Sequence, residues 1–174
     1  MNTKLYDAAA TLSPADLVAD KGAFFGSILG TMNHLVLGDT LWLQRFALLA
    51  NSNNAGAESH PTPHPALASV SQLPKPKTLN AILFTDLAAL RQRRMLLDAA
   101  ISSWVAALTD DDLAQNMLYT NMLGTPQCKH MGSLLLHFFN HQTHHRGQVT
   151  TLLTQAGVDI GVTDLVALIP GKTG

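Results

Sequence analysis

The sequence predicts an all-α protein, a bundle of four main helices with at most a small hairpin before the last helix. Three long stretches repeat apolar residues at helical spacing, and a shorter helical stretch precedes them. Gly and Pro residues lie between these stretches and mark where helices end. The 174 residues contain no internal repeat and no composition boundary, which predicts one domain over residues 1–174.

The first two main helices are expected before residue 51. A short helix is predicted over residues 4–11, followed by a helical turn that Ser13 caps and Pro14 begins. A long helix is predicted from about Gly22 to Ala50, where apolar side chains recur every three or four positions. Its buried stripe is expected to contain Phe25, Ile28, Met32, Leu35, Trp42, Leu43 and Phe46. Residues 51–78 then break the pattern, and a connection of this length is expected to be functional or mobile.

The remaining elements follow from caps and turn residues. Thr78 is expected to cap a long helix that ends near Leu108, and Thr109 is expected to begin a short turn. The buried stripe of this third main helix is expected to contain Leu79, Ile82, Leu83, Leu87, Leu90, Leu97, Ile101 and Val105. Residues 118–128, with Gly124 near the centre, predict a small hairpin. The last helix is predicted over residues 131–155 and ends at Gly157, before a tail with one more helical turn after Thr163.

Composition excludes several classes of function. A net charge of −1 gives no basic footprint for nucleic acid. No run of apolar residues is long enough for a membrane span, and no signal peptide is apparent, so a cytoplasmic protein is expected. The sole cysteine, Cys128, excludes an intramolecular disulfide and is expected to be a small buried residue. Only 13% of residues are charged, and Gly147 lies within a helix, which together predict a homodimer interface.

Four of the eight histidines lie within nine residues of the last predicted helix: His137, His141, His144 and His145. On a helical wheel His145 falls inside the apolar arc and His141 at its edge, while the other two lie on the flank. An imidazole on a buried face needs a partner. That partner is either an ordinary hydrogen-bonding group or a metal ion, and the spacing alone does not decide between them.

A third histidine favours the metal. His34 lies on the first long helix, where Ser27, Thr31 and Gly38 are small neighbours that leave room beside an imidazole. Three histidines would leave coordination positions open for water or substrate, as in catalytic metal sites. The flanking His137 and His144 are then expected to support the ligands or to lie at the surface.

The scarcity of glutamate excludes two other metal sites. The only glutamate is Glu58, which lies in the Pro-rich connection. Bundles that hold two metal ions need several Glu ligands, and a zincin needs Glu directly after its first ligand, where this chain has Gln142. Asp39 is expected to be a buried carboxylate, which either orients a ligand imidazole or pairs with Arg91, Arg93 or Arg94.

The residues around the histidines resemble those of a known family. The run from Asn140 to Gln148 resembles the HxxxHRGQ signature of the DinB/YfiT-like proteins, and the run from Thr31 to Leu43 resembles the segment that supplies their first histidine. The resemblance covers nearly the whole chain. It implies an up-down-down-up four-helix bundle, often dimeric, in which His34, His141 and His145 bind one divalent metal ion.

The resemblance also implies a range of functions. Characterised relatives include thiol-dependent S-transferases and a thiol-dependent isomerase, so the expected function is a metal-dependent enzyme that activates a low-molecular-weight thiol. Metal-dependent hydrolysis is a close alternative. A non-catalytic, stress-related binding or structural protein with a stabilising metal is the alternative of another class, and a heme or oxygen-binding bundle is a distant third. Zinc, nickel and iron all suit imidazole ligands, and the sequence does not choose between them.

Overall fold

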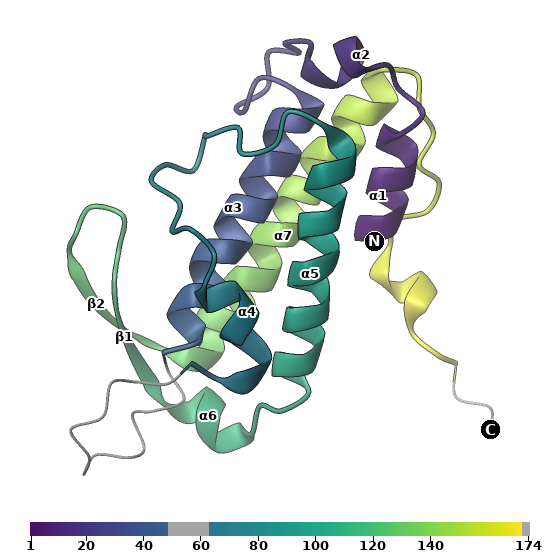
Figure 1. The fold of residues 1–174 in the computed structure, drawn as a ribbon. Helices are drawn as coiled ribbons and strands as arrows, with labels where there is room; N and C mark the ends of the chain where they lie inside the picture. Colours follow the sequence, from purple (N-terminus) through teal and green to yellow (C-terminus); the bar gives the residue numbers. More distant parts are fainter. Residues whose placement is uncertain (49–62, 172–174) are drawn as a thin grey trace.

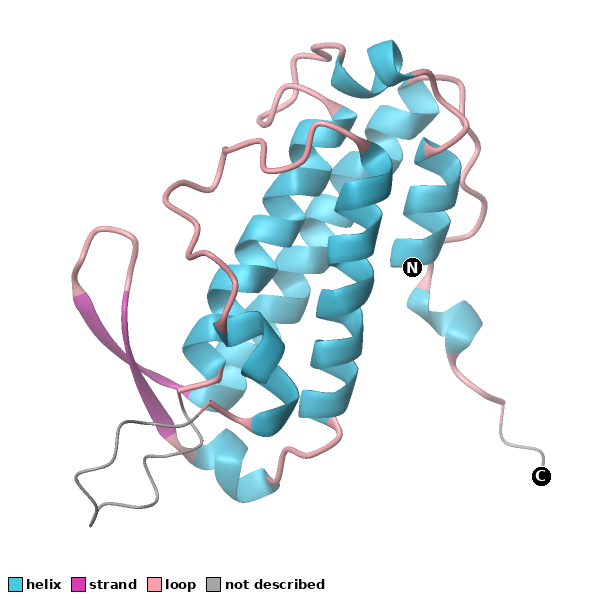
Figure 2. Cartoon of the chain, in the orientation of Figure 1, coloured by secondary structure: helices cyan, strands magenta, loops and turns pink. Residues whose placement is uncertain are grey.

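The computed structural model describes residues 1–48 and 63–171, and the chain there is mostly helical with one small two-stranded sheet. The longer helices are α1 (Asn2–Ala9), α3 (Ile28–Phe46), α5 (Leu87–Val105) and α7 (Met131–Gln155). Shorter elements are α2 (Pro14–Val18), α4 (Ala68–Ser71), α6 (Asp110–Ala114) and two 3-10 turns at Pro65–Leu67 and Leu165–Leu168. The mostly helical class predicted from the sequence is therefore confirmed (Figures 1 and 2).

The helix α3 is the centre of the packing. It contacts both α5 and α7, and α1 contacts the same two helices (Figure 1). Almost every residue of α3 is buried, which explains why a hydrophobic stretch of this length carries few charges. The core includes Phe46, Trp104 and Phe138, whose rings pack against one another between α3, α5 and α7.

Helix α3 begins later than the sequence predicts. Its first residue is Ile28, because the Ser27 side chain accepts a hydrogen bond from the Gly30 N–H and caps the helix there. Gly22 and Gly26 have φ angles of 67° and 73°, which break the helical pattern upstream. Phe25 therefore belongs to a loop rather than to the helix.

Helix α5 also begins later than predicted. Thr78 does not cap it; the Asp86 side chain accepts from the Ala89 N–H, and the helix starts at Leu87. Ile82 and Leu83, predicted to be in the buried stripe, are 51% and 48% exposed, because their segment crosses α3 as a loop. Within the predicted 51–78 connection, residues 65–71 form a 3-10 turn and α4, with Leu67 and Val70 buried; residues 51–62 lie outside the described residues.

The predicted hairpin and the predicted end of the last helix are confirmed. Strands β1 (Asn116–Thr120) and β2 (Pro126–His130) pair antiparallel, with Asn116 opposite His130 and a turn that includes Gly124 at φ 81°. Helix α6 has a capping box between Thr109 and Asp112. Gly157, with φ 81°, follows the end of α7 in the left-handed conformation expected after a helix.

Cys128 is exposed, so the prediction that it is buried is wrong. It lies on β2 opposite Leu118, which is itself 79% exposed, because the hairpin stands away from the bundle (Figure 1). Among the described residues, none of the helices has the length and hydropathy that crossing a membrane requires.

Candidate metal centre

Three histidine side chains meet between α3 and α7. His34 comes from α3, and His141 and His145 come from successive turns of α7. The Nε2 atom of His34 lies 3.1 Å from the Nε2 atom of His141 and 3.1 Å from that of His145. His34 and His145 are buried, at 4% and 8% exposed, and His141 is half-buried. The structure therefore brings together the three residues that the sequence selected.

Two of the imidazoles are oriented by hydrogen bonds at their other nitrogen. His34 Nδ1 donates to the Leu79 carbonyl oxygen at 2.7 Å, and His145 Nδ1 donates to Gln148 Oε1 at 2.7 Å. An oxygen acceptor requires the proton to be on Nδ1, which leaves Nε2 of each neutral ring with a free lone pair. Hydrogen bonds of this kind fix both the tautomer and the ring orientation of metal-binding histidines.

The donor set fits a cation. Two unprotonated Nε2 atoms only 3.1 Å apart repel each other unless a positive charge lies between them. The His141 Nδ1 atom is buried and has no hydrogen-bond partner among the described residues. Three neutral imidazole nitrogens within reach of one another, with no carboxylate, are typical ligands of zinc, nickel and iron.

Burial lowers the pKa of all three histidines. Desolvation is the main cause for each. For His141, desolvation together with the neighbouring His145 and His34 lowers the pKa to about 3. The hydrogen bonds of His34 to Leu79 and of His145 to Gln148 oppose the shift. The rings are therefore neutral near pH 7, which is the protonation state that a metal ion requires.

A pH prediction follows for the metal-free protein. The unfolded chain binds protons on these histidines below its ordinary pKa of 6.5, whereas the folded chain binds them only at lower pH. Stability is therefore full above 6.5 and is lost as the pH falls toward the folded values. Thermal unfolding in the presence of a chelator should show Tm falling across this range, with a smaller fall in His141→Gln than in the exposed His137→Gln. An equal fall of Tm with pH in the two variants would contradict the conclusion that buried His141 contributes to this loss of stability.

Gly38 provides the space for His141. A Cβ atom at this position would lie 2.9 Å from His141 Cε1, closer than real Cβ contacts. Gly38 is one turn after His34 on α3, and the His141 ring occupies the space that its missing side chain leaves. The sequence prediction of small neighbours beside His34 is confirmed at this residue.

Gly38→Ala should therefore weaken metal binding by about 10- to 100-fold, the effect expected when a ligand is displaced through its neighbour. Alanine within a helix normally stabilises it by about 0.5–1 kcal/mol relative to glycine. The substitution is therefore expected to weaken the metal site without destabilising the helix. Gly147→Ala is the matched control, because no described atom lies within 4 Å of a Cβ there. Competition titration with a chromophoric chelator measures both variants, and unchanged affinity in Gly38→Ala would refute the steric role.

Two further residues were missed by sequence reasoning. The Phe25 ring stacks on His34 with centroids 3.8 Å apart and meets His145 edge-on at 5.5 Å, so it covers one side of the site. Asn33 is buried; its side chain donates to the Phe84 carbonyl and accepts from the N–H groups of Leu83 and Phe84. It therefore fixes the segment whose Leu79 carbonyl orients His34. Helical spacing placed Phe25 in a buried stripe but gave neither residue a role at the histidine cluster, because these contacts are non-local.

The two flanking histidines lie outside the cluster, as predicted. Both are exposed. His137 packs edge-on against Trp42, with centroids 5.3 Å apart. His144 Nε2 lies 3.3 Å from Gln148 Nε2, and it thus contacts the residue that orients His145.

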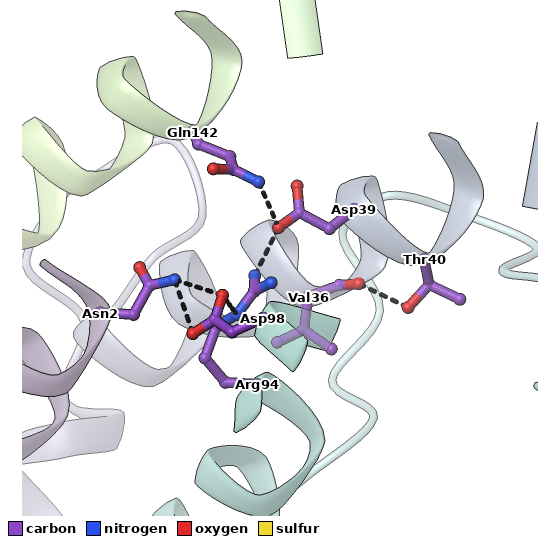
Figure 3. A network of polar contacts seen from close by, with 7 residues as sticks. All are labelled: Asn2, Val36, Asp39, Thr40, Arg94, Asp98 and Gln142. Atoms are coloured by element: carbon purple, nitrogen blue, oxygen red, sulfur yellow. Dashed lines mark hydrogen bonds and ion pairs between the residues drawn. The ribbon is translucent and has the colours of Figure 1, made fainter. Parts of the chain in front are cut away.

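Asp39 belongs to a separate buried network (Figure 3). Its Oδ2 atom accepts hydrogen bonds from Arg94 Nη1 and, at 2.9 Å, from Gln142 Nε2. Arg94 Nε also lies 2.9 Å from Asp98 Oδ1. The Asn2 side-chain amide donates hydrogen bonds to both carboxylate oxygens of Asp98. The interpretation that Asp39 orients a ligand imidazole is wrong, and the alternative of pairing with Arg94 is confirmed.

Comparison with known proteins places the chain in one family. The family model described as DinB family matches residues 1–171, which is nearly the whole chain. No curated protein and no solved structure matches the chain. The match extends over both segments that supply the three histidines, which agrees with their convergence in the structure. The chain therefore belongs to the DinB family.

Proposed function

We propose that His34, His141 and His145 bind one divalent metal ion per chain, and that the protein is a metal-dependent enzyme that activates a low-molecular-weight thiol for S-transfer. The observation that carries this proposal is the convergence of three Nε2 atoms, two of them held unprotonated by Leu79 and Gln148. Zinc, nickel and iron are the candidate metals, since all three accept imidazole ligands.

A metal with three protein ligands keeps positions open and lowers the pKa of a thiol or water bound there. The surrounding residues supply the rest of the site. Phe25 covers the face of His34 and limits the access of bulk water. Gln148 and the Leu79 carbonyl hold two ligands in place and keep their protons on Nδ1. Activation of water, giving hydrolysis, is the alternative within the same class.

The proposal is tested on purified, untagged protein in two steps. Elemental analysis should find one divalent metal ion per chain. The metal-loaded protein should then consume a thiol, such as cysteine or glutathione, when an electrophilic co-substrate is present, and the chelated protein should not. Product formation without thiol consumption would identify hydrolysis, and absence of metal from the native and the reconstituted protein would refute both activities.

A non-catalytic role has one specific observation in its favour. His34 and His145 are almost fully buried, at 4% and 8% exposed, as ligands of a structural metal often are. In that case the cobalt-substituted protein should show spectra that do not change on adding thiols, and chelation should lower the Tm strongly. Spectral shifts with thiols would favour the enzyme.

We also propose the finer architecture implied by the family: four main helices running up-down-down-up, in a cytoplasmic homodimer. Exposed apolar side chains on α5 and α7, among them Met95, Leu96 and Leu136, support a subunit interface. Gly147 is exposed on α7, and a Cβ atom there would meet no described atom within 4 Å, which leaves space for a helix of a second copy.

A further inference from the structure

The segment of residues 73–84 crosses the outer side of α3 and is held at both ends. At its start the Leu73 carbonyl accepts a hydrogen bond of 2.7 Å from Gln44 Nε2. Towards its end the segment is bonded to His34 through Leu79 and to Asn33 through Leu83 and Phe84. Figure 1 shows this connection, between α4 and α5, running beside α3. Its lysines, Lys75 and Lys77, are thus carried on a backbone fixed in place.

Three neighbouring cavities open around this segment, and Lys75 lines all three. Their volumes are about 450, 290 and 480 Å³. The first is floored by Leu37, Leu83 and Phe84 and also contains Lys77 and Arg93; the other two share Arg45. We call these cavities together the basic groove. Among the residues that the structure describes, none of those that line these cavities is Asp or Glu.

The cations of the basic groove lack acidic partners. The ion pairs among the described residues involve Arg91 and Arg94, and none involves Arg45, Lys75, Lys77 or Arg93. Arg45 instead lies over the rings of Trp42 and Tyr119, at 4.8 and 4.9 Å, and donates to the Thr120 carbonyl. Burial lowers the pKa of Arg45, because its charge is partly removed from water, and Tyr119 acts against that shift.

This concentration of charge is unusual for the chain. The protein carries 11 Lys and Arg residues and a net charge of −1, yet four of those cations border one apolar-floored groove whose described lining contains no Asp or Glu. Cavities with one sign of charge and low-dielectric walls concentrate ligands of the opposite sign. The apolar floor and the fixed cations together match a small molecule with an acidic group on an organic body.

We propose that the basic groove binds a small organic anion in its first cavity, with its carboxylate or phosphate held by Lys75 and Lys77 and its apolar part against Leu83 and Phe84. The inference goes beyond the proposed function and does not depend on a bound metal.

The test measures binding of two probes, inorganic phosphate and succinate, by calorimetry in dilute buffer, with neutral succinamide as the chemical control. Metal-free and metal-loaded protein are both measured. The variant Lys75→Gln/Lys77→Gln should bind the preferred anion at least about tenfold more weakly, the loss expected for about 1.4 kcal/mol. The matched control Lys21→Gln/Lys129→Gln removes the same two charges from exposed sites outside the groove and should bind within about twofold of wild type.

The outcomes separate the possibilities. Preference for phosphate or for succinate identifies the acidic group, and added salt should weaken either. Equal losses in the two double variants would reduce the effect to net charge and overturn the proposal, as would binding of neither anion or tighter binding of a short single-stranded RNA. Because metal content is measured on the same samples, failure of the anion site and failure of the metal site are distinguishable.

Discussion

Replacing His145 by Ala is expected to lower the affinity for a divalent metal ion by at least about 100-fold. Structural zinc sites gain roughly 10–16 kcal/mol from four ligands, so one ligand accounts for roughly 2.5–4 kcal/mol. His145 is buried, and its ring is already oriented by Gln148, so little of the gain is spent on ordering it. The change in affinity is measured by titrating metal into the metal-free protein in the presence of a competing chelator.

The neighbouring His144→Ala is the matched control for His145→Ala. His144 is exposed and not part of the cluster, so its loss should change the affinity by no more than a few fold. A second measurement guards against a merely misfolded variant. Added metal should raise the Tm of wild type and His144→Ala, since a ligand at 100 times its Kd stabilises by about 2.7 kcal/mol. Added metal should not raise the Tm of the folded His145→Ala variant. An equal rise in Tm in all three proteins would contradict metal binding by His145.

Replacing Arg94 by Met should lower the free energy of unfolding by about 3–5 kcal/mol, because the Asp39 carboxylate is left buried without its cation. Burial raises the pKa of Asp39, and the contacts with Arg94 and Gln142 act against that shift. With Arg94 removed, the Gln142 amide is the one remaining donor to the charged oxygen among the described residues. Urea denaturation followed by circular dichroism measures the loss.

Two variants complete the Arg94 experiment. Arg93→Met removes the neighbouring arginine, which stacks on Phe84 without an ion pair among the described residues, and should cost less than about 1 kcal/mol. The double variant Asp39→Leu/Arg94→Met removes both charges and should recover most of the loss, since apolar replacements of a buried ion pair are often neutral. A single Arg94→Met variant as stable as Arg93→Met would show that the network does not support the fold.

The sequence predicted the secondary structure well where its signals are local. The hairpin at residues 118–128 and the end of α7 before Gly157 follow from turn residues, which act within a few positions. The starts of α3 and α5 were placed too early by six and eight residues, at 22 rather than 28 and at 79 rather than 87. In both cases apolar residues continue upstream of the true cap, and apolar spacing cannot distinguish a helix from a loop that packs on one.

The histidine cluster was predictable because two of its members share one face of one helix. His141 and His145 are one turn apart, so periodicity alone places them together. Selecting His34 required two further observations, its small neighbours and the family resemblance. The close approach of His141 to Gly38 confirms the space expected there. That the three residues bind a metal ion stays a prediction.

What the sequence determined by itself was the mostly helical class, the hairpin and the identity of the clustered histidines. Only the tertiary structure decided which groups orient them: the Leu79 carbonyl, Gln148 and the stacked ring of Phe25. It also decided that Asp39 pairs with Arg94 and that the cations at Arg45, Lys75, Lys77 and Arg93 border one groove. The physical reason is range: helix periodicity and caps act over a few residues, whereas a hydrogen bond between residues 34 and 79 depends on how separate helices pack.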